Sequence, residues 1–175
     1  MVKLPSYVTG FLVGGAYCLC WLVTGSVIGG IVNARAQTDA EFADSYFRHG
    51  DAWYEKGQWD RAIAEYDRAI ALGSARAEFY TNRGNARQAT GDLEGAYQDY
   101  STALEINPSS APTYYNRGNI RQIRGDWDGA IADYTKAIAL DRNFGLAYIK
   151  RAKVRRLRGD FGAALEDLNQ AVSRS

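Results

Sequence analysis

Two neighbouring stretches of sequence decide the fold. Residues 77–110 read AEFYTNRGNARQATGDLEGAYQDYSTALEINPSS, and residues 111–144 read APTYYNRGNIRQIRGDWDGAIADYTKAIALDRNF. They align without insertion, so that NRGNAR at 82–87 recurs 34 residues later as NRGNIR at 116–121. The same spacing continues on both sides and gives four copies, 43–76, 77–110, 111–144 and 145–175, the last cut short. A fixed period of this length is typical of proteins built from stacked repeats.

Several positions of the repeat keep one kind of residue and predict two helices in each copy. Counting from one within a copy, an aromatic at position 4 and a small residue at position 8 share a helix face. Glycine at position 15 can end the first helix in the left-handed conformation. The aspartate after it (Asp92, Asp126, Asp160) can cap the second helix, whose apolar stripe is formed by positions 20, 24 and 27. Such hairpins bury their apolar faces only by stacking, so the sequence predicts an all-α solenoid.

These columns resemble the tetratricopeptide repeat (TPR) family, whose unit is a 34-residue helix–turn–helix. The resemblance covers 43–175 and implies a right-handed superhelical solenoid of four hairpins. The segments NRGN, GDWDGAIADY and KAIAL resemble the sequences of cyanobacterial members of the family. The chain departs from the family pattern at position 7, where leucine is usual, and at position 11, where tyrosine is usual. Arginines stand there instead in most copies, at Arg83, Arg117, Arg151, Arg87, Arg121 and Arg155.

The N-terminal part predicts a membrane segment. Residues 7–32 are 26 residues without a charge, which as a helix is long enough to cross a bilayer. We divide the chain into this anchor or signal peptide (1–36), a linker (37–42) and the repeat domain (43–175). A retained anchor is favoured because the run is long for a secretory peptide, although Ala34-Arg35-Ala36 resembles a cleavage site. Either interpretation predicts an extracytoplasmic repeat domain in a periplasm or lumen, tethered to the membrane or released after Ala36.

The resemblance implies a groove for an extended peptide, lined by positions 2, 5, 6, 9, 12 and 13 of each first helix. Asparagine suits that task because its amide both donates and accepts hydrogen bonds toward a main chain. The alternative is that these asparagines are frequent consensus residues of the family. Carried over by position, the predicted groove consists of Phe47, Arg48, Asp51, Tyr54, Asn82, Asn85, Gln88, Tyr115, Asn116, Asn119, Gln122, Lys150, Lys153 and Arg156.

The charges of this groove narrow the class of partner. Lys150 and Lys153 favour acidic residues at the fourth copy. Family members that bind chaperone tails use a lysine at position 5 of one copy and another at position 2 of the copy after the next, where this chain has Thr81 and Leu146. The resemblance therefore disfavours capture of a chaperone C-terminus.

The repeated arginines lie on the packing side of the first helix. Because a buried guanidinium needs a carboxylate, we expect ion pairs with the acid at position 23, such as Arg83–Asp99 and Arg117–Asp133. A basic edge that meets phosphate or nucleic acid is the rival interpretation. The formal net charge of +1 gives no general attraction to nucleic acid.

The residues offer little for catalysis. His49 is the only histidine, and the two cysteines, Cys18 and Cys20, lie in the apolar run. Nothing in the repeats matches a phosphate loop, a dinucleotide fingerprint or a metal site. We therefore expect no enzyme activity, no cofactor and no metal, and a protein as the partner.

Two functions remain at this stage. The first is a membrane-anchored scaffold or adaptor that binds a partner segment in its groove, which by analogy alone fits an assembly factor for a membrane complex. The second is a self-assembling module that pairs through its fourth copy, where Leu165, Leu168 and Val172 form an apolar face without a polar cap.

Overall fold

The computed structural model describes residues 37–73 and 76–174. Within the described residues, 39–174 form one compact unit. The predicted membrane segment at 7–32 lies outside the described residues, as does the whole of the predicted domain 1–36. Among the residues described, no helix is both long and apolar enough to span a bilayer.

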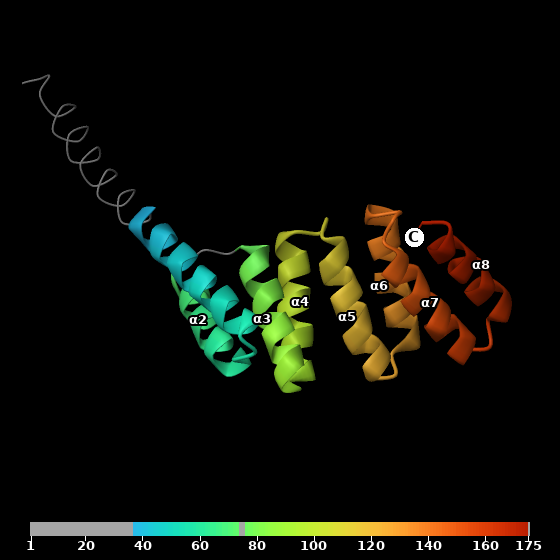
Figure 1. The fold of residues 1–175 in the computed structure, drawn as a ribbon, viewed down its shortest axis with the longest axis horizontal. Coiled ribbons are helices and arrows are strands. Elements are labelled where there is room, and N and C mark those ends of the chain that lie inside the picture. The colour runs from blue at the N-terminus through green and yellow to red at the C-terminus, as the bar shows by residue number, and fades with distance from the viewer. Residues whose placement is uncertain (1–36, 74–75, 175) are drawn as a thin grey trace, which may run out of the picture. The chain divides into compact units, whose positions relative to one another are not determined.

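The described residues fold into eight helices and no strand, which confirms the all-α prediction. A helix over residues 37–55 is followed by α2 (Trp59–Ala71), and each later repeat likewise contributes two helices. We call the first helix of each repeat its A helix and the second its B helix. The hairpins stack in chain order (Figure 1). The remaining helices are α3 (Ala77–Thr90), α4 (Leu93–Ile106), α5 (Ala111–Ile123), α6 (Trp127–Leu140), α7 (Gly145–Leu157) and α8 (Phe161–Val172).

The turn inside each hairpin follows the predicted chemistry with one exception. The glycine at position 15 has a φ between 70° and 89° in all four repeats. Asp92 and Asp126 then cap α4 and α6 by accepting the N–H of Gly95 and Gly129 at 2.9 Å. The predicted cap by Asp160 is wrong, because that side chain accepts no such bond.

Both capped repeats have glycine at position 19. A Cβ on Gly95 would lie 2.2 Å from the Asp92 carboxylate, so a side chain there would require the capping carboxylate to shift. The fourth repeat has Ala163 at this position, and the Asp160 carboxylate lies 3.9 Å from Arg158 Nε instead of on a backbone N–H.

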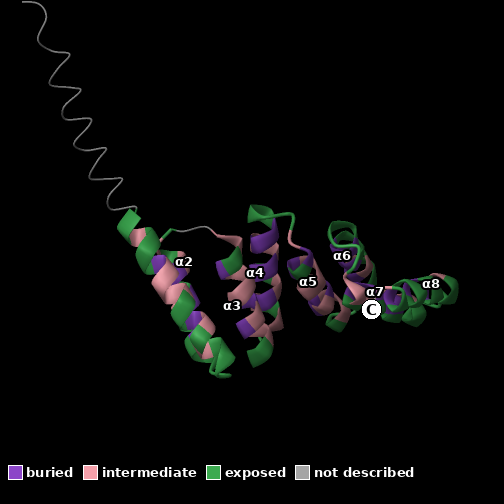
Figure 2. Cartoon of the chain, turned by 45° about the horizontal axis from the view of Figure 1, so that its top comes forward, coloured by how far each residue is buried: buried purple, intermediate pink, exposed green. Residues whose placement is uncertain are grey.

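The core lies between the helices of neighbouring repeats, as the purple residues in Figure 2 show along α4. Its largest side chains are the tyrosines at position 24, which are at most 1% exposed in the first three repeats. Each packs against the A helix of the next repeat, where position 10 supplies Ala86, Ile120 or Val154. Stacking therefore buries what a single hairpin would expose.

The arginines occupy the predicted ion pairs. Arg83 binds the carboxylate of Asp99 through two nitrogens, at 3.0 and 2.6 Å, and Arg117 binds Asp133 in the same way, at 3.0 and 2.8 Å. A second arginine joins each carboxylate from position 11. Both aspartates are buried, so these pairs hold the two helices of a hairpin together, and the packing interpretation is confirmed.

Candidate peptide-binding groove

Two hollows run along the A helices where the groove was predicted. One, of about 360 Å³, joins the first three repeats and is lined in part by Phe47, Asp51, Glu78, Thr81, Asn82 and Thr113. The other, of about 370 Å³, is lined by Tyr54, Asn85, Gln88, Ala89 and Asn116. Of the fourteen predicted residues, these hollows bring together Phe47, Asp51, Asn82, Tyr54, Asn85, Gln88 and Asn116.

Polar side chains at position 9 are held by the buried tyrosines of the same repeat. The Tyr66 hydroxyl donates to Asp51 Oδ1 at 2.7 Å, and the Tyr100 hydroxyl donates to Asn85 Oδ1 at 2.8 Å. The third repeat has the same bond, from Tyr134 to Asn119 Oδ1 at 2.9 Å. Gln88 and Gln122 place their amide oxygens 2.9 and 3.0 Å from the last two hydroxyls.

The same position 9 oxygens also bind the following repeat. Asn82 donates its amide to Asp51 Oδ1, and Asn116 donates to Asn85 Oδ1, both at 2.9 Å. We call the position 6 and position 9 side chains with their tyrosines the amide ladder: Asp51, Asn82, Asn85, Asn116, Asn119, Tyr66, Tyr100 and Tyr134. The ladder crosses from repeat to repeat, so it sets the position of one A helix relative to the next.

The ladder fixes which half of each amide remains available. Asn85 Oδ1 accepts two hydrogen bonds, which occupy its lone pairs, so its NH2 group is the free half. In Asn116 the NH2 group is used and the oxygen is free. Within the described residues, the buried side-chain nitrogens and oxygens that lack a partner are Arg76 Nε and Arg121 Nε. The free halves of Asn85 and Asn116 are therefore open to solvent.

Two predicted groove residues are part of the packing. The Phe47 ring lies 4.8 Å from that of Phe79, between centroids, and the Tyr115 ring lies 5.0 Å from that of Phe144. Both belong to clusters that join neighbouring repeats. Phe47 also lines the first hollow, whereas Tyr115 lines neither of the two.

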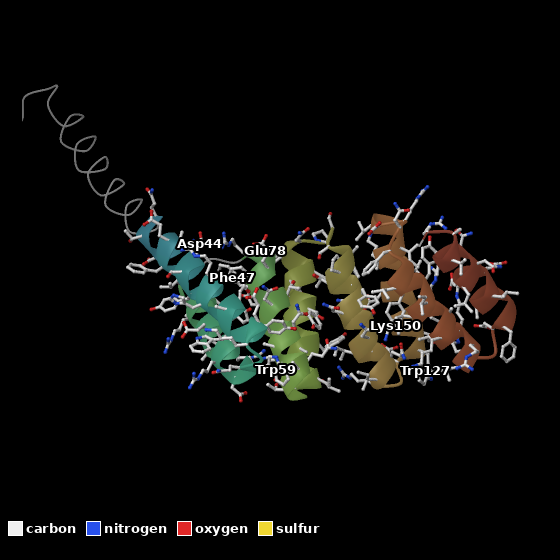
Figure 3. All side chains as sticks on the ribbon, in the orientation of Figure 1. Asp44, Phe47, Trp59, Glu78, Trp127 and Lys150 are labelled. Carbon is white, nitrogen blue, oxygen red and sulfur yellow. The ribbon has the colours of Figure 1, made fainter. Side chains whose placement is uncertain are left out.

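The fourth repeat brings basic groups instead of amides. Figure 3 labels Lys150 on α7, at the position where Asn82 and Asn116 stand in their repeats. Lys150 is half-buried, whereas Lys153 and Arg156 are exposed. None of the three has an ion pair among the residues described, and the same holds for the exposed Arg48 of the first repeat. This face thus carries carboxylates (Asp51, Glu78) and Arg48 in the first two repeats, amides in the second and third, and cations without carboxylates in the fourth.

The sequence reasoning missed the link between the asparagines and the tyrosines. The sequence pattern places position 24 in the apolar stripe, although a buried tyrosine hydroxyl needs a hydrogen-bond partner. The partner at position 9 lies 15 residues earlier, in the facing helix. It also missed Thr81 and Thr113, whose hydroxyl oxygens are 3.2 Å apart in the first hollow.

Burial raises the pKa of the three ladder tyrosines. The main cause is loss of solvent around the hydroxyl, and in Tyr66 the hydrogen bond to the Asp51 carboxylate adds to it. These hydroxyls are therefore neutral donors at physiological pH, which is the form that the ladder requires.

Two models of protein families match the repeat domain. The family model described as TPR repeat matches residues 50–91 and 87–123, and the one described as Tetratricopeptide repeat matches 111–144. No curated protein sequence matches the chain.

Several solved structures share the fold. A crystal structure of MamA is 21% identical over 93% of this chain and 96% of its own, with a TM-score of 0.74. The TPR domain of Arabidopsis OM64 is 28% identical over 67% of this chain and 98% of its own, with a TM-score of 0.66. The first TPR domain of Spaghetti (RPAP3), solved with the HSP90 peptide SRMEEVD, is 22% identical over 69% of this chain and 95% of its own (TM-score 0.67).

TPR domains are protein–protein interaction modules, and two of the similar structures contain a bound peptide. The matches to the family models together span more than half of the chain, and none of these families is catalytic. With the helical hairpins and their turn glycines in place, the chain belongs to the tetratricopeptide repeat family.

Proposed function

We propose that this chain is a membrane-tethered scaffold that binds an extended segment of another protein along its A helices. The observation that carries the proposal is the amide ladder. It leaves an NH2 donor at Asn85 and an oxygen acceptor at Asn116 pointing to solvent from fixed side chains. A peptide main chain needs both kinds of partner, and an amide already held in place loses little side-chain entropy on binding.

The spacing of the ladder suits an extended main chain. Packed helices lie about 8–10 Å apart, and a strand advances about 3.3 Å per residue. Each repeat would therefore meet the partner about once every three residues. Since these contacts involve main-chain groups, they would fix the position of the segment and leave side-chain preference to the walls of the groove.

The charges at the end of the groove support an acidic segment. Lys150, Lys153 and Arg156 lack acidic partners among the described residues, and they follow the neutral amides of α5. Acidic residues of the partner would lie against α7. Exposed charges contribute modestly to affinity and more to orientation and association rate, so this end would set the direction in which the segment lies.

Selection of peptides on the purified full chain tests the proposal. A random peptide library is expected to yield binders with acidic residues grouped at one end. The Asn85→Asp variant should keep the ladder, because Asp51 accepts the equivalent two bonds in the first repeat, but it removes the free NH2 donor. We expect selected peptides to bind this variant about tenfold more weakly.

A matched variant separates loss of the donor from added charge. Ala89→Asp places a carboxylate in the same hollow and leaves Asn85 intact. The proposal requires a larger loss of affinity for Asn85→Asp than for Ala89→Asp, with unchanged melting of both. Equal peptide affinities of the two variants would show that the amide ladder is not part of the binding site.

We also propose that residues 7–32 hold the repeat domain at a membrane, on its extracytoplasmic side, and that the scaffold serves assembly of a membrane complex. The uncharged length of this run supports the tether. N-terminal sequencing of the mature protein, together with alkaline extraction of membranes, tests it. A protein that keeps its N-terminus and stays in the pellet is expected, whereas a mature N-terminus at Gln37 in the soluble fraction would contradict the tether.

A further inference from the structure

The outer face of α8 carries an exposed apolar stripe. Phe161, Leu165, Leu168 and Val172 are 68%, 61%, 44% and 75% exposed. At about 100° per residue, these four side chains lie within a sector of roughly 60°. Figure 1 shows α8 at the end of the stack, with no described helix beyond it.

At two of the four stripe positions the counterparts in earlier repeats are covered, whereas at position 17 the counterparts Trp59 and Trp127 are 39% and 38% exposed. Position 24 is Leu168 here, whereas its counterparts Tyr66, Tyr100 and Tyr134 are at most 1% exposed. Position 28 is Val172, and its counterparts Leu104 and Ile138 are 6% and 8% exposed. In those repeats the A helix of the next repeat lies over the B helix. The α8 stripe is thus built like a surface that receives another helix.

We propose that this stripe docks on the same stripe of a second copy of this chain. Its spacing of four, three and four residues is the heptad pattern of two helices packed side by side. The flanking residues are Gly162, Ala164, Asn169 and Ala171. None of them is charged, so a symmetric contact brings no like charges together at these positions; Ala164 and Ala171 are themselves buried, and Gly162 adds no side chain beside the stripe.

The other arrangement of two copies would be head to tail, with the first A helix of one copy over α8 of the next. In the ladder, position 6 of one repeat binds position 9 of the repeat before it. Head-to-tail stacking would place Arg48 of one copy against Lys153 of the other. This like-charge contact disfavours the continuous stack and leaves the symmetric pair.

The size of the stripe predicts a weak pair. Four side chains with these exposures present on the order of 400 Å² per copy. A dimer that buries about twice this area lies at the small, transient end of protein interfaces. Association should therefore depend on concentration, and the tether to a membrane would promote it by confining both copies.

Cysteine cross-linking of the full chain in membranes tests the pair. In a background with Cys18→Ser and Cys20→Ser, Asn169→Cys places a thiol beside the stripe and leaves its four apolar side chains intact. A short bismaleimide is expected to give covalent dimers at least tenfold faster than it does for Lys136→Cys, an exposed control on α6. Adding Leu165→Asp should abolish the difference, and circular dichroism should show unchanged helix content because Leu165 is exposed.

Two results would overturn the proposal. One is an Asn169→Cys rate no greater than that of the Lys136→Cys control. The other is cross-linking that requires Ala52→Cys on one copy and Asn169→Cys on the other, which is the signature of head-to-tail stacking. The stripe lies apart from the amide ladder, so neither result bears on peptide binding in the groove.

Discussion

The residues at positions 8 and 24 are coupled by direct contact. A Cβ added to Gly84 would lie 2.8 Å from Cε1 of Tyr100, and Gly50 and Gly118 face their tyrosines in the same way. The fourth repeat changes both members, to Ala152 and Leu168. The one repeat that has alanine at position 8 is thus the one that lacks the tyrosine ring at position 24. Glycine is needed here for space, since none of these three glycines has a positive φ.

This coupling can be measured by a double-mutant cycle. Gly84→Ala should lower the free energy of unfolding by about 1–3 kcal/mol through overpacking, even though alanine favours a helix. In a Tyr100→Leu background the same substitution should be neutral or stabilising. Urea unfolding of the four proteins gives the coupling free energy, and purely additive effects would contradict the steric account.

The ladder tyrosines predict a loss of stability at alkaline pH. Burial raises the pKa of Tyr66, Tyr100 and Tyr134 above the usual value of about 10. A group with a raised folded pKa contributes its full stability below the unfolded pKa and loses it as pH rises toward the folded value. Above pH 10 the three together should remove about 4 kcal/mol per pH unit. Denaturant unfolding from pH 8 to 11 measures the slope, and Tyr100→Phe should reduce it by about one third.

At the scale of the element, each of the last three hairpins is closed by one carboxylate between two arginines. Asp133 receives Arg117 and Arg121, and its side chain is 4% exposed. The position 7 arginines also reach back to the preceding B helix: Arg83 binds Asp67 at 2.6 Å, and Arg151 binds Thr135 at 2.9 Å. The ion pairs therefore join helices within a repeat and between repeats.

Removal of one carboxylate should destabilise the domain strongly. Asp133→Asn leaves two largely buried guanidinium groups without their counter-charge, which should cost about 3 kcal/mol of unfolding free energy. The control is Asp128→Asn, whose side chain is 85% exposed and pairs with Arg158 at the surface; its effect should stay below about 1 kcal/mol. Similar effects of both substitutions on thermal or urea unfolding would show that burial of the pair is unimportant.

The sequence predicted this element well because its rules are local. The 34-residue period and the turn glycines predicted the hairpins. The acid at position 23 predicted the Arg83–Asp99 ion pair. The missing cap at Asp160 was not predicted, because the Gly-Asp pair at the turn is the same as in the two capped repeats. The hydrogen bond from Tyr100 to Asn85 was missed for another reason: it joins facing helices, and the hydroxyl was counted as part of an apolar column.

At the scale of the repeat domain, the ladder and the charge pattern together define a direction. Acidic side chains mark the first hollow, amides follow in the second, and cations without acidic partners in the described residues mark α7. The sequence placed these residues on one face, but it did not predict that the amides bind one another across repeats. That contact depends on how closely the hairpins stack, which composition and period do not determine.

The cationic end should control the salt dependence of binding. Lys150→Gln with Lys153→Gln is expected to weaken an acidic peptide about three- to tenfold at low salt and to flatten the dependence of affinity on ionic strength. Lys136→Gln on α6 removes an exposed charge away from the A helices and should change neither. Peptide titrations at 50 and 500 mM salt decide between these outcomes. An unchanged salt dependence in the double variant would show that α7 does not contact the bound segment.

Binding of a partner segment along the amide ladder is tested most directly by locating a bound peptide on the repeat domain. Alanines at 89 and 139 are both exposed, the first in the second hollow and the second on the B helix α6. A photoreactive residue is placed at each in turn in the full chain, and a library-selected peptide is added. Binding along the amide ladder should give a covalent adduct from position 89, which Asn85→Asp reduces, and none from position 139. Equal adducts from both positions, or an adduct only from position 139, would contradict binding along the amide ladder.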